Sequence, residues 1–291
     1  MHKKIELFDI AVYLIVFLIC AVMLYPLLNV AAVSISSHSA YIQNPMRIWP
    51  SEISFDAYKE ILSHPVLARS YLNTLIVTVS GVALGIFLYI ITGYPLSKTH
   101  LKGRAILIHL VIFTMLFNGG LIPNFYLIRS LGMLDTLAAL VFPGLFSAFS
   151  LILMVNFMQN IPEELEEAAK MDGASEPYIL FKIVVPLSMP IIATLTLFAA
   201  VGYWNSFFSA IIYIRSVENW PLMLFLREVI VGAQMMQISA GGNSAEIGNM
   251  NVMPETLKYA TIMIVMLPIL SVYPFLQRFF VKGIMLGSVK G

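Results

Sequence analysis

A cluster of carboxylates in the middle of the chain has the residue types and spacing of a functional helix. The four glutamates of this cluster are Glu163, Glu164, Glu166 and Glu167. Asn160 is placed to cap the helix N-terminus, Glu163 completes an arrangement like a capping box, and Pro162 suits the first turn. Carboxylates in the N-terminal half favour the helix dipole, and Gly173 suits the left-handed position that ends a helix. The pattern predicts a short helix over 161–172.

This predicted helix also has a narrow apolar stripe with small residues at its far end. The stripe consists of Ile161, Leu165, Ala168 and Ala169. Such a stripe lets the surface of another protein come close, so the helix is a candidate docking element. The alternative is a solvated acidic connector, which a charge run usually is.

The composition indicates what kind of chain must position this helix. Hydrophobic residues make up 59% of the 291 residues, charged residues 11%, and the mean hydropathy is +0.86. Soluble domains carry roughly 25% charged residues. A soluble fold of this size could not hide so much apolar surface, whereas a bilayer can. The net charge of +1 provides no electrostatic footprint for nucleic acid.

Six apolar stretches are long enough to cross a bilayer, since a helical span needs ~20 mostly apolar residues. They cover 10–33, 72–96, 105–128, 137–158, 185–213 and 259–280. The chain is therefore predicted to be a single all-α transmembrane domain over 1–291, with the acidic helix between the fourth and fifth spans. Asn118, Gly119, Gly120 and Pro123 interrupt the third stretch, where we expect a kink or a short break.

The N-terminus shares with signal peptides a basic start, Lys3 and Lys4, before an apolar run. That run extends from Ile10 to Val33, beyond the ~7–15 residues of a signal core, so an uncleaved first span is favoured. Cys20 is the only cysteine, which excludes an internal disulfide and a CxxC-type metal site. The preceding Ile19 stands where a lipoprotein cleavage site needs a small residue.

Lysine and arginine near the span ends indicate the orientation of the chain. With the N-terminus inside, the inside segments hold the larger set, Lys3, Lys4, Lys98, Lys102, Arg104, Lys170, Lys182, Arg278, Lys282 and Lys290. The outside segments hold Arg47, Lys59, Arg69, Arg129, Arg215, Arg227 and Lys258. Both termini are therefore predicted to be cytoplasmic. In the long outside segment 214–258, Leu222–Gln237 predicts a helix packed on the bundle or at the interface.

The acidic helix belongs to a longer pattern with fixed spacing. Glu167, Ala168 and Ala169 are followed after three residues by Gly173, then after nine by Ile183, and then by Val185 and Pro186. This segment resembles the EAA loop of bacterial ATP-binding-cassette importer permeases, whose pattern is EAA-x3-G-x9-I-x-L-P. Val185 in place of leucine is the only departure from that pattern.

The resemblance implies a coupling helix that docks into a cleft on a separate ATP-binding subunit. Glu167 would contact that subunit, Ala168 and Ala169 would allow close approach, and Gly173 would form the turn. Asp172, Ile183 and Pro186 complete the implied coupling set. The chain has no GxxxxGK[ST] phosphate loop, so ATP and Mg²⁺ would be used by partner chains and no cofactor bound by this one.

The resemblance extends to partners and location. It implies a second permease subunit in a heterodimer, two ATP-binding subunits, an extracellular solute-binding protein and a bacterial cytoplasmic membrane. The strings Asn118–Pro123, Leu131–Thr136 and Tyr203–Phe208 resemble permeases of the carbohydrate-uptake branch, related to the smaller maltose-transporter permease and closest to those for complex oligosaccharides. A sugar, and most simply an oligosaccharide, is the implied cargo.

A candidate sugar path contains aromatic platforms and planar hydrogen-bonding groups, as carbohydrate sites do. Tyr203, Trp204 and Asn205 supply these within one turn of the fifth span, and Asn118 is a further candidate. The alternative is that the aromatic residues mark the bilayer interface or pack the bundle. Other polar groups in the spans, Asn73, Thr74, Thr78 and Asn156, predict inter-helix hydrogen bonds, and Gly81 and Gly85 predict close helix packing.

Two other classes of membrane protein compete with the importer interpretation. A secondary transporter needs coupling-ion residues within the spans, and no Asp, Glu, Lys or Arg lies mid-span. A membrane enzyme needs a recognisable site, and the sequence contains no HExxH, no paired intramembrane carboxylates and no nucleophile–base motif. We therefore expect no catalytic residue and no metal site in this chain.

Overall fold

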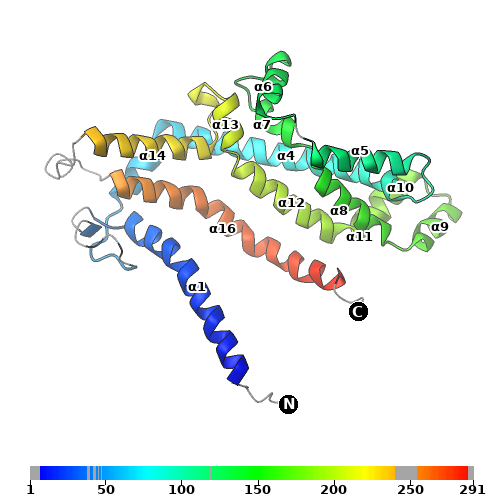
Figure 1. Ribbon diagram of the computed structural model, residues 1–291, viewed down its shortest axis with the longest axis horizontal. Coiled ribbons are helices and arrows are strands. Elements are labelled where there is room, and N and C mark those ends of the chain that lie inside the picture. The colour runs from blue at the N-terminus through cyan, green and yellow to red at the C-terminus, as the bar shows by residue number, and fades with distance from the viewer. Residues whose placement is uncertain are drawn as a thin grey trace. The chain divides into compact units, whose positions relative to one another are not determined.

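The computed structural model describes residues 7–37, 40, 41, 44, 46, 48–117, 119–239 and 254–287, with side chains described over 8–37, 40, 41, 44, 46, 48–117, 119–235 and 254–271. This part of the chain is built from helices (Figure 1). The extended pairing found within it is one antiparallel bridge between Ser36 and Ile53. The all-α fold class is confirmed.

The helices of this part of the chain follow one another in sequence, and most of them are labelled in Figure 1. They are α1 Leu7–Ser34, α3 Asp56–Leu62, α4 Pro65–Ser97, α5 Arg104–Leu116, α6 Leu121–Ser130, α7 Ala138–Val141, α8 Ala148–Gln159, α9 Glu163–Met171, α10 Glu176–Ile179, α11 Val185–Leu187, α12 Met189–Trp204, α13 Phe208–Tyr213, α14 Leu222–Ser239 and α16 Pro254–Gly287. Short turns lie between some of them, namely η1 Phe142–Gly144, a π-helical η2 Leu180–Val184 and η3 Val217–Asn219.

Two helices within the described residues are long and apolar enough to cross a membrane, Phe8–Ser34 and Pro65–Ser97. Three bent helix pairs raise this number to five when each pair is counted as one span. The sixth predicted span lies inside α16, whose side chains are described only up to Ser271. The chain is a multi-pass helical membrane protein, and the count of six spans stays a prediction.

The expected break in the third stretch is confirmed. Helix α5 ends at Leu116, and α6 begins at Leu121. Gly120 stands before α6 with a φ of 85°, a backbone conformation that side chains with a Cβ rarely adopt. Asn118, within the break, lies outside the described residues.

The fourth stretch is also broken, although the sequence predicts one continuous span. Its two helices, Ala138–Gly144 and Ala148–Gln159, meet at a bend of 49°. Pro143 lacks a backbone donor, which weakens the helix just before the bend. Ser147 then starts α8, its side chain accepting a hydrogen bond from the Ser150 amide, while its own amide donates to the Tyr89 hydroxyl at 2.9 Å.

The fifth stretch differs from its prediction at both ends. A bend of 77° separates Glu176–Leu187 from Met189–Trp204, and the predicted span of 185–213 crosses it. Pro190, in the first turn of α12, has no amide to continue the preceding helix. A second interruption after Trp204 separates α12 from α13. Sequence hydropathy missed these breaks because the stretch as a whole stays apolar, although Ser188, Asn205 and Ser206 lie at them.

The chain divides by its contacts into two compact units. One comprises Met1–Leu67 with Phe225–Pro268, and the other Ala68–Leu224 with Ile269–Gly291. The prediction of a single transmembrane domain is not tested by this division. In the first unit, the hydroxyls of Ser34 and Tyr58 are 2.9 Å apart, and the ring centroids of His64 and Phe225 are 5.0 Å apart.

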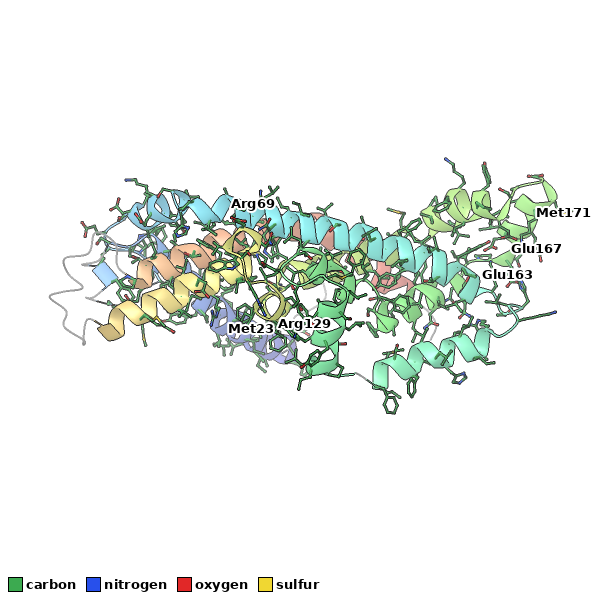
Figure 2. All side chains as sticks on the ribbon, turned by 90° about the horizontal axis from the view of Figure 1, so that it is seen from above. Met23, Arg69, Arg129, Glu163, Glu167 and Met171 are labelled. Atoms are coloured by element: carbon green, nitrogen blue, oxygen red, sulfur yellow. The ribbon has the colours of Figure 1, made fainter. Side chains whose placement is uncertain are left out.

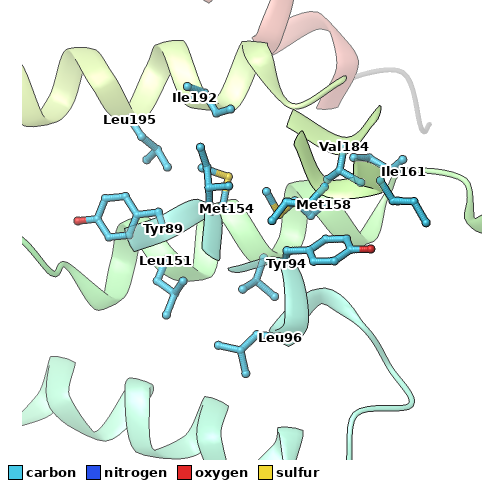
Figure 3. Close-up of a cluster of buried hydrophobic side chains, with 14 residues drawn as sticks. Tyr89, Tyr94, Leu96, Leu151, Met154, Met158, Ile161, Val184, Ile192 and Leu195 are labelled. Carbon is cyan, nitrogen blue, oxygen red and sulfur yellow. The ribbon is translucent and has the colours of Figure 1, made fainter. Parts of the chain in front are cut away.

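The core of the second unit is a cluster of buried apolar side chains from α4, α8, η2 and α12 (Figure 3). Tyr89 lies on one side of this cluster, and Tyr94 lies on the other side near Ile161 and Val184 (Figure 3). The core therefore connects the helices that carry the acidic segment with the helices that carry the candidate sugar path.

Three of the polar residues expected to bond between helices belong to α4, and the structure gives two of them a more specific role. The Asn73 amide donates to the carbonyls of Glu218 and Trp220 at 2.8 and 3.0 Å, and the Thr74 hydroxyl accepts from the Leu222 amide at 2.7 Å. Asn73 therefore holds the segment before α14, whereas Thr74 bonds to the first residue of α14, as an inter-helix hydrogen bond predicts. The buried Thr78 hydroxyl has no hydrogen-bond partner among the described residues.

Candidate coupling helix and transport cavity

The acidic helix exists as α9, but its predicted N-terminal cap is wrong. Pro162 occupies the N-cap position and makes no side-chain cap. Asn160 instead ends α8, and its side-chain amide donates to the Asn156 carbonyl at 2.7 Å. The Asn160 side chain is therefore used at the end of α8, and Ile161 is buried in the core between the two helices.

The predicted C-terminal end of α9 is confirmed. Gly173 has a φ of 80°. Its amide donates to the Lys170 carbonyl at 3.0 Å, and the amide of Ala174 donates to the Ala169 carbonyl at 2.9 Å. These two hydrogen bonds form a Schellman motif, which satisfies carbonyls at the end of the helix.

The exposed side of α9 presents the residues predicted for docking. Glu167 and Ala168 are exposed, and Met171 is 89% exposed. Figure 2 shows Glu163, Glu167 and Met171 together at one end of the second unit, away from Arg69 and Arg129. The predicted apolar stripe is split: Ile161 and Ala169 pack against the core, whereas Leu165 and Ala168 face outwards.

The remaining predicted coupling residues do not lie on this exposed side of α9. Asp172 is the exposed C-cap residue of α9. Ile183 lies in η2 and packs against the buried cluster, and the exposed Pro186 lies in α11. The second half of the motif thus anchors the segment that follows α9.

Glu166 is a buried, ion-paired residue of α9 that the spacing pattern did not single out. It is only 6% exposed, unlike its neighbours on α9. Its carboxylate forms an ion pair with Lys98, just beyond the end of α4, and lies 3.1 Å from the Tyr94 hydroxyl. The same hydroxyl lies 3.0 Å from the Glu176 carboxylate. The sequence carries no signal for the burial of Glu166, because the four glutamates look alike in the charged segment and only the fold turns one of them inwards.

Lys170 adds a second ion pair beside the first. Its ammonium is 2.7 Å from the Glu176 carboxylate, and both side chains are about half exposed. The hydrogen bond to Glu176 raises the pKa of Lys170. The Lys98 ammonium also lies 4.8 Å from the centre of the Tyr94 ring, a cation–π distance.

Tyr203 is the predicted sugar-path residue that lines a cavity. The cavity has a volume of about 480 Å³ and lies in the second unit. Its wall contains aromatic and hydroxyl side chains, among them Tyr89, Phe149, Phe198, Tyr203, Ser206 and Ser209. The Tyr203 hydroxyl donates to the Val141 carbonyl at 3.1 Å. None of the described residues in this wall carries a charge.

Glycines allow Tyr203 to lie where it does. A Cβ at Gly81 would come within 2.4 Å of the Tyr203 ring, and one at Gly144 within 3.2 Å of its hydroxyl. The prediction that Gly81 permits close packing is therefore confirmed, with α12 as the neighbour of α4. A methyl group at Gly81 would therefore force the Tyr203 ring to shift.

The other predicted sugar-path residues lie elsewhere. Trp204 is 7% exposed and meets the ring of Tyr71 edge-on, with centroids 6.4 Å apart, so it packs the bundle. Asn205 is the exposed C-cap residue of α12 and does not line the cavity. Asn118 lies outside the described residues. Helical spacing put Tyr203, Trp204 and Asn205 on different faces, which their adjacency in sequence concealed.

A second polar centre lies around Asp135, on the loop before α7. Its carboxylate accepts hydrogen bonds from the amides of Arg215 and Ser216, at 2.9 and 2.8 Å, and from the Ser216 hydroxyl. Its backbone carbonyl accepts from the Asn219 side chain at 2.6 Å, and its amide donates to the Tyr213 carbonyl at 2.8 Å. These hydrogen bonds lower the pKa of Asp135 to about 2.

A metal site would need several ligands in one place. No group of three or more His, Cys, Asp or Glu side chains in the described ranges is arranged to hold a metal ion. The polar chemistry of the described chain is concentrated in the α9 network, the Asp135 centre and the cavity.

These features define a class of protein: a multi-pass helical permease with an exposed acidic helix at one end of its bundle. The chain belongs to the family described as binding-protein-dependent transport system inner membrane component, whose model matches residues 67–286. It is a transport permease subunit and not an enzyme.

Two relatives from Bacillus subtilis (strain 168) match nearly the whole chain. The polygalacturonan/rhamnogalacturonan transport system permease protein YtcP is 42% identical, over 99% of this chain and 100% of its own length. Protein LplC is 42% identical, over 99% of this chain and 97% of its own length. The expected kinship with the carbohydrate branch is confirmed.

Solved structures agree with this assignment. One chain of a bacterial ABC transporter involved in the import of the acidic polysaccharide alginate superimposes with a TM-score of 0.85 at 33% identity, covering 96% of this chain and 99% of that one. A chain of the alginate transporter in complex with an alginate-pentasaccharide-bound periplasmic protein matches with a TM-score of 0.55 at 14% identity, covering 92% of each, and shares the fold.

Proposed function

We propose that this chain forms half of the translocation path of an ATP-driven oligosaccharide importer. It works with a second permease subunit, two ATP-binding subunits that use ATP and Mg²⁺, and an extracellular solute-binding protein. The observation that carries the proposal is α9. It is a short acidic helix with Glu167 and Ala168 exposed, at the position of the EAA pattern in a chain of this family.

In this proposal α9 docks into the ATP-binding subunit through its exposed side. Glu167 makes a polar contact there, and the small Ala168 lets the two backbones approach. Ala169 packs inwards, and Asp172 and Gly173 end the helix, so that they fix its length and direction. Ile183 holds the following segment against the core, and Pro186 shapes the exposed α11 that comes after it.

The proposed cargo is an oligosaccharide that contains uronic acid. Support comes from the relatives, since YtcP is named for polygalacturonan and rhamnogalacturonan and the similar structure for alginate. The cavity at Tyr203 offers aromatic faces for stacking on sugar rings and hydroxyls for hydrogen bonding. Because its described wall has no charge, this subunit would contact the rings, and the carboxylates would be recognised elsewhere.

The proposed orientation places both termini and α9 in the cytoplasm of a bacterial cell. Its support is that segments predicted on the same side lie together. The loop of Asp135 bonds with Arg215 and Ser216, and α9 pairs with Lys98. A second permease has apolar surfaces to cover, since α5 buries no side chain and every side chain from Phe8 to Leu28 is exposed.

The test uses the complete complex in proteoliposomes, with oligogalacturonides as the probe, presented by the binding protein. We expect uptake that requires ATP on the α9 side and that falls at least tenfold in Glu167→Lys. Glu218→Lys, an exposed glutamate far along the chain on a loop, is the matched control and should transport normally. Uptake driven by an ion gradient without ATP would contradict the proposal and favour a secondary transporter.

A further inference from the structure

The buried carboxylate of Glu166 is the part of α9 that docking does not explain. A docking surface needs exposed groups, and Glu163, Glu164 and Glu167 are exposed. Glu166 faces the other way and is paired within the chain. Since burying a charge is costly unless it is paired, its position implies a role inside this subunit.

Four side chains from three elements meet at this point. Tyr94 and Lys98 come from the end of α4, Glu166 from α9 and Glu176 from α10. The Tyr94 hydroxyl lies between the two carboxylates, at 3.1 and 3.0 Å, while Lys98 pairs with Glu166 and Lys170 with Glu176. Each carboxylate thus has a cation of its own, and one hydroxyl joins the two pairs.

Few apolar contacts hold α9 against the core. Ala169 and Ile161, which lies just before the helix, pack against the core, whereas Leu165 is 45% exposed. A buried ion pair with a shared hydrogen bond has one favourable geometry, so it fixes the distance and angle between α9 and α4 more tightly than two small apolar contacts can.

The other contacts of α4 lead towards the cavity. Gly81, in the middle of α4, lies against the ring of Tyr203, and Tyr203 lines the cavity. A displacement of the end of α4 can therefore reach the cavity wall through one continuous helix. This gives a physical route from α9 to the proposed sugar path, and the route requires the attachment of α9 to α4.

We propose that Tyr94, Lys98, Glu166 and Glu176 form a latch that transmits the movement of α9 to α4 and thereby to the cavity wall at Tyr203. These are positioning residues, since they contact neither the ATP-binding subunit nor the sugar. The inference rests on the proposed function of α9 as the docking helix. Without the latch, α9 would still dock, and ATP would still be hydrolysed, but the movement would not reach the path.

The test compares transport with ATP hydrolysis in the complete complex in proteoliposomes, again with oligogalacturonides as the probe. The variants are Lys98→Met, Glu166→Gln and the exchange of Lys98→Glu with Glu166→Lys. We expect both single variants to keep the ATP-binding subunits bound and to hydrolyse ATP. Their uptake per ATP should fall at least about fivefold, the lower end of typical couplings between sites. The exchange should restore most of this ratio.

Glu218→Gln, which changes an exposed glutamate outside α9, is the control and should keep the normal ratio. An unchanged ratio in both single variants, or an assembled exchange variant as defective as they are, would overturn the latch. If the single variants fail to assemble, Tyr94→Phe decides, because it removes one hydroxyl: a lowered ratio supports the latch and an unchanged ratio overturns it. Glu167→Lys separates the two proposals, since full docking and transport in that variant contradict the function of α9 itself.

Discussion

The two polar centres of the second unit are built on different principles. Around Glu166, charged side chains pair with each other across α4, α9 and α10. Around Asp135, one carboxylate accepts hydrogen bonds from backbone amides of a single loop. A backbone donor is fixed by its own helix or turn, whereas the side chains around Glu166 come from separate elements. The Asp135 centre is therefore suited to hold one loop, and the Glu166 centre to join α4, α9 and α10 in one arrangement.

The largest expected effect is at the ion pair between Lys98 and Glu166, where removing one of the two charges should cost more stability than removing both. Glu166→Ala leaves the Lys98 ammonium largely buried and unpaired, since its side chain is only 17% exposed. We expect a loss of about 3–5 kcal/mol in the stability of the α9 attachment. The double variant Lys98→Met with Glu166→Leu should lose much less, because no charge is left buried. Thermal unfolding of the purified protein in detergent measures both, and equal losses would contradict a charge-based attachment.

A smaller loss is expected at the Asp135 centre. Asp135→Ala removes the acceptor for two amides and one hydroxyl, which costs about 1–3 kcal/mol. The loop that follows α13 should then be cut faster in limited proteolysis. Asp56→Ala is the matched control, because that carboxylate is exposed and pairs with the exposed Lys59, so its removal should change stability little. No change in the cleavage rate would show that the loop is held by other contacts.

The dependence on pH should distinguish the two centres further. The folded pKa of Asp135, about 2, lies below the ordinary value of 3.8. Its contribution to stability is therefore complete above the ordinary value and is lost as the pH falls from about 4 towards 2. The unfolding temperature of the native protein should fall more steeply in this window than that of Asp135→Asn. Parallel curves would mean that the hydrogen bonds to this carboxylate contribute no stability.

The smallest effect concerns the backbone cap that ends α9. Gly173 has a φ of 80° with open space around it, so Gly173→Ala costs about 1–2 kcal/mol through the backbone alone. Gly202→Ala, inside α12 and also in open space, is the matched control and should be neutral or slightly stabilising. Comparison of their unfolding temperatures tests this, and equal shifts would remove the left-handed cap as an explanation.

Local patterns predicted a large part of the molecule. The composition and long apolar runs indicated a helical membrane protein, Gly173 indicated the end of α9, and Gly120 indicated the break after α5. The spacing from Glu167 to Pro186 indicated the family. Each of these depends on residues close together in sequence, for which helix geometry and backbone conformation follow directly from residue type.

Features that depend on the distance between helices were not predictable. In sequence, Asn160 suits both the start of one helix and the end of another, and the structure places it at the end of α8. The bend at Ser147 is stabilised by Tyr89, which lies far away in sequence. Trp204 packs the bundle while its neighbour Tyr203 lines a cavity, because adjacent residues on a helix point in different directions.

Residue types and short spacings are sufficient to predict that the chain crosses a membrane in helices and carries an acidic helix of the importer type. Bilayer hydrophobicity and helix capping act over a few turns, so local sequence is enough for this. Which of the four similar glutamates is buried depends instead on how the helices pack. That choice depends on Lys98 and Tyr94, which α4 brings to α9 from far along the chain.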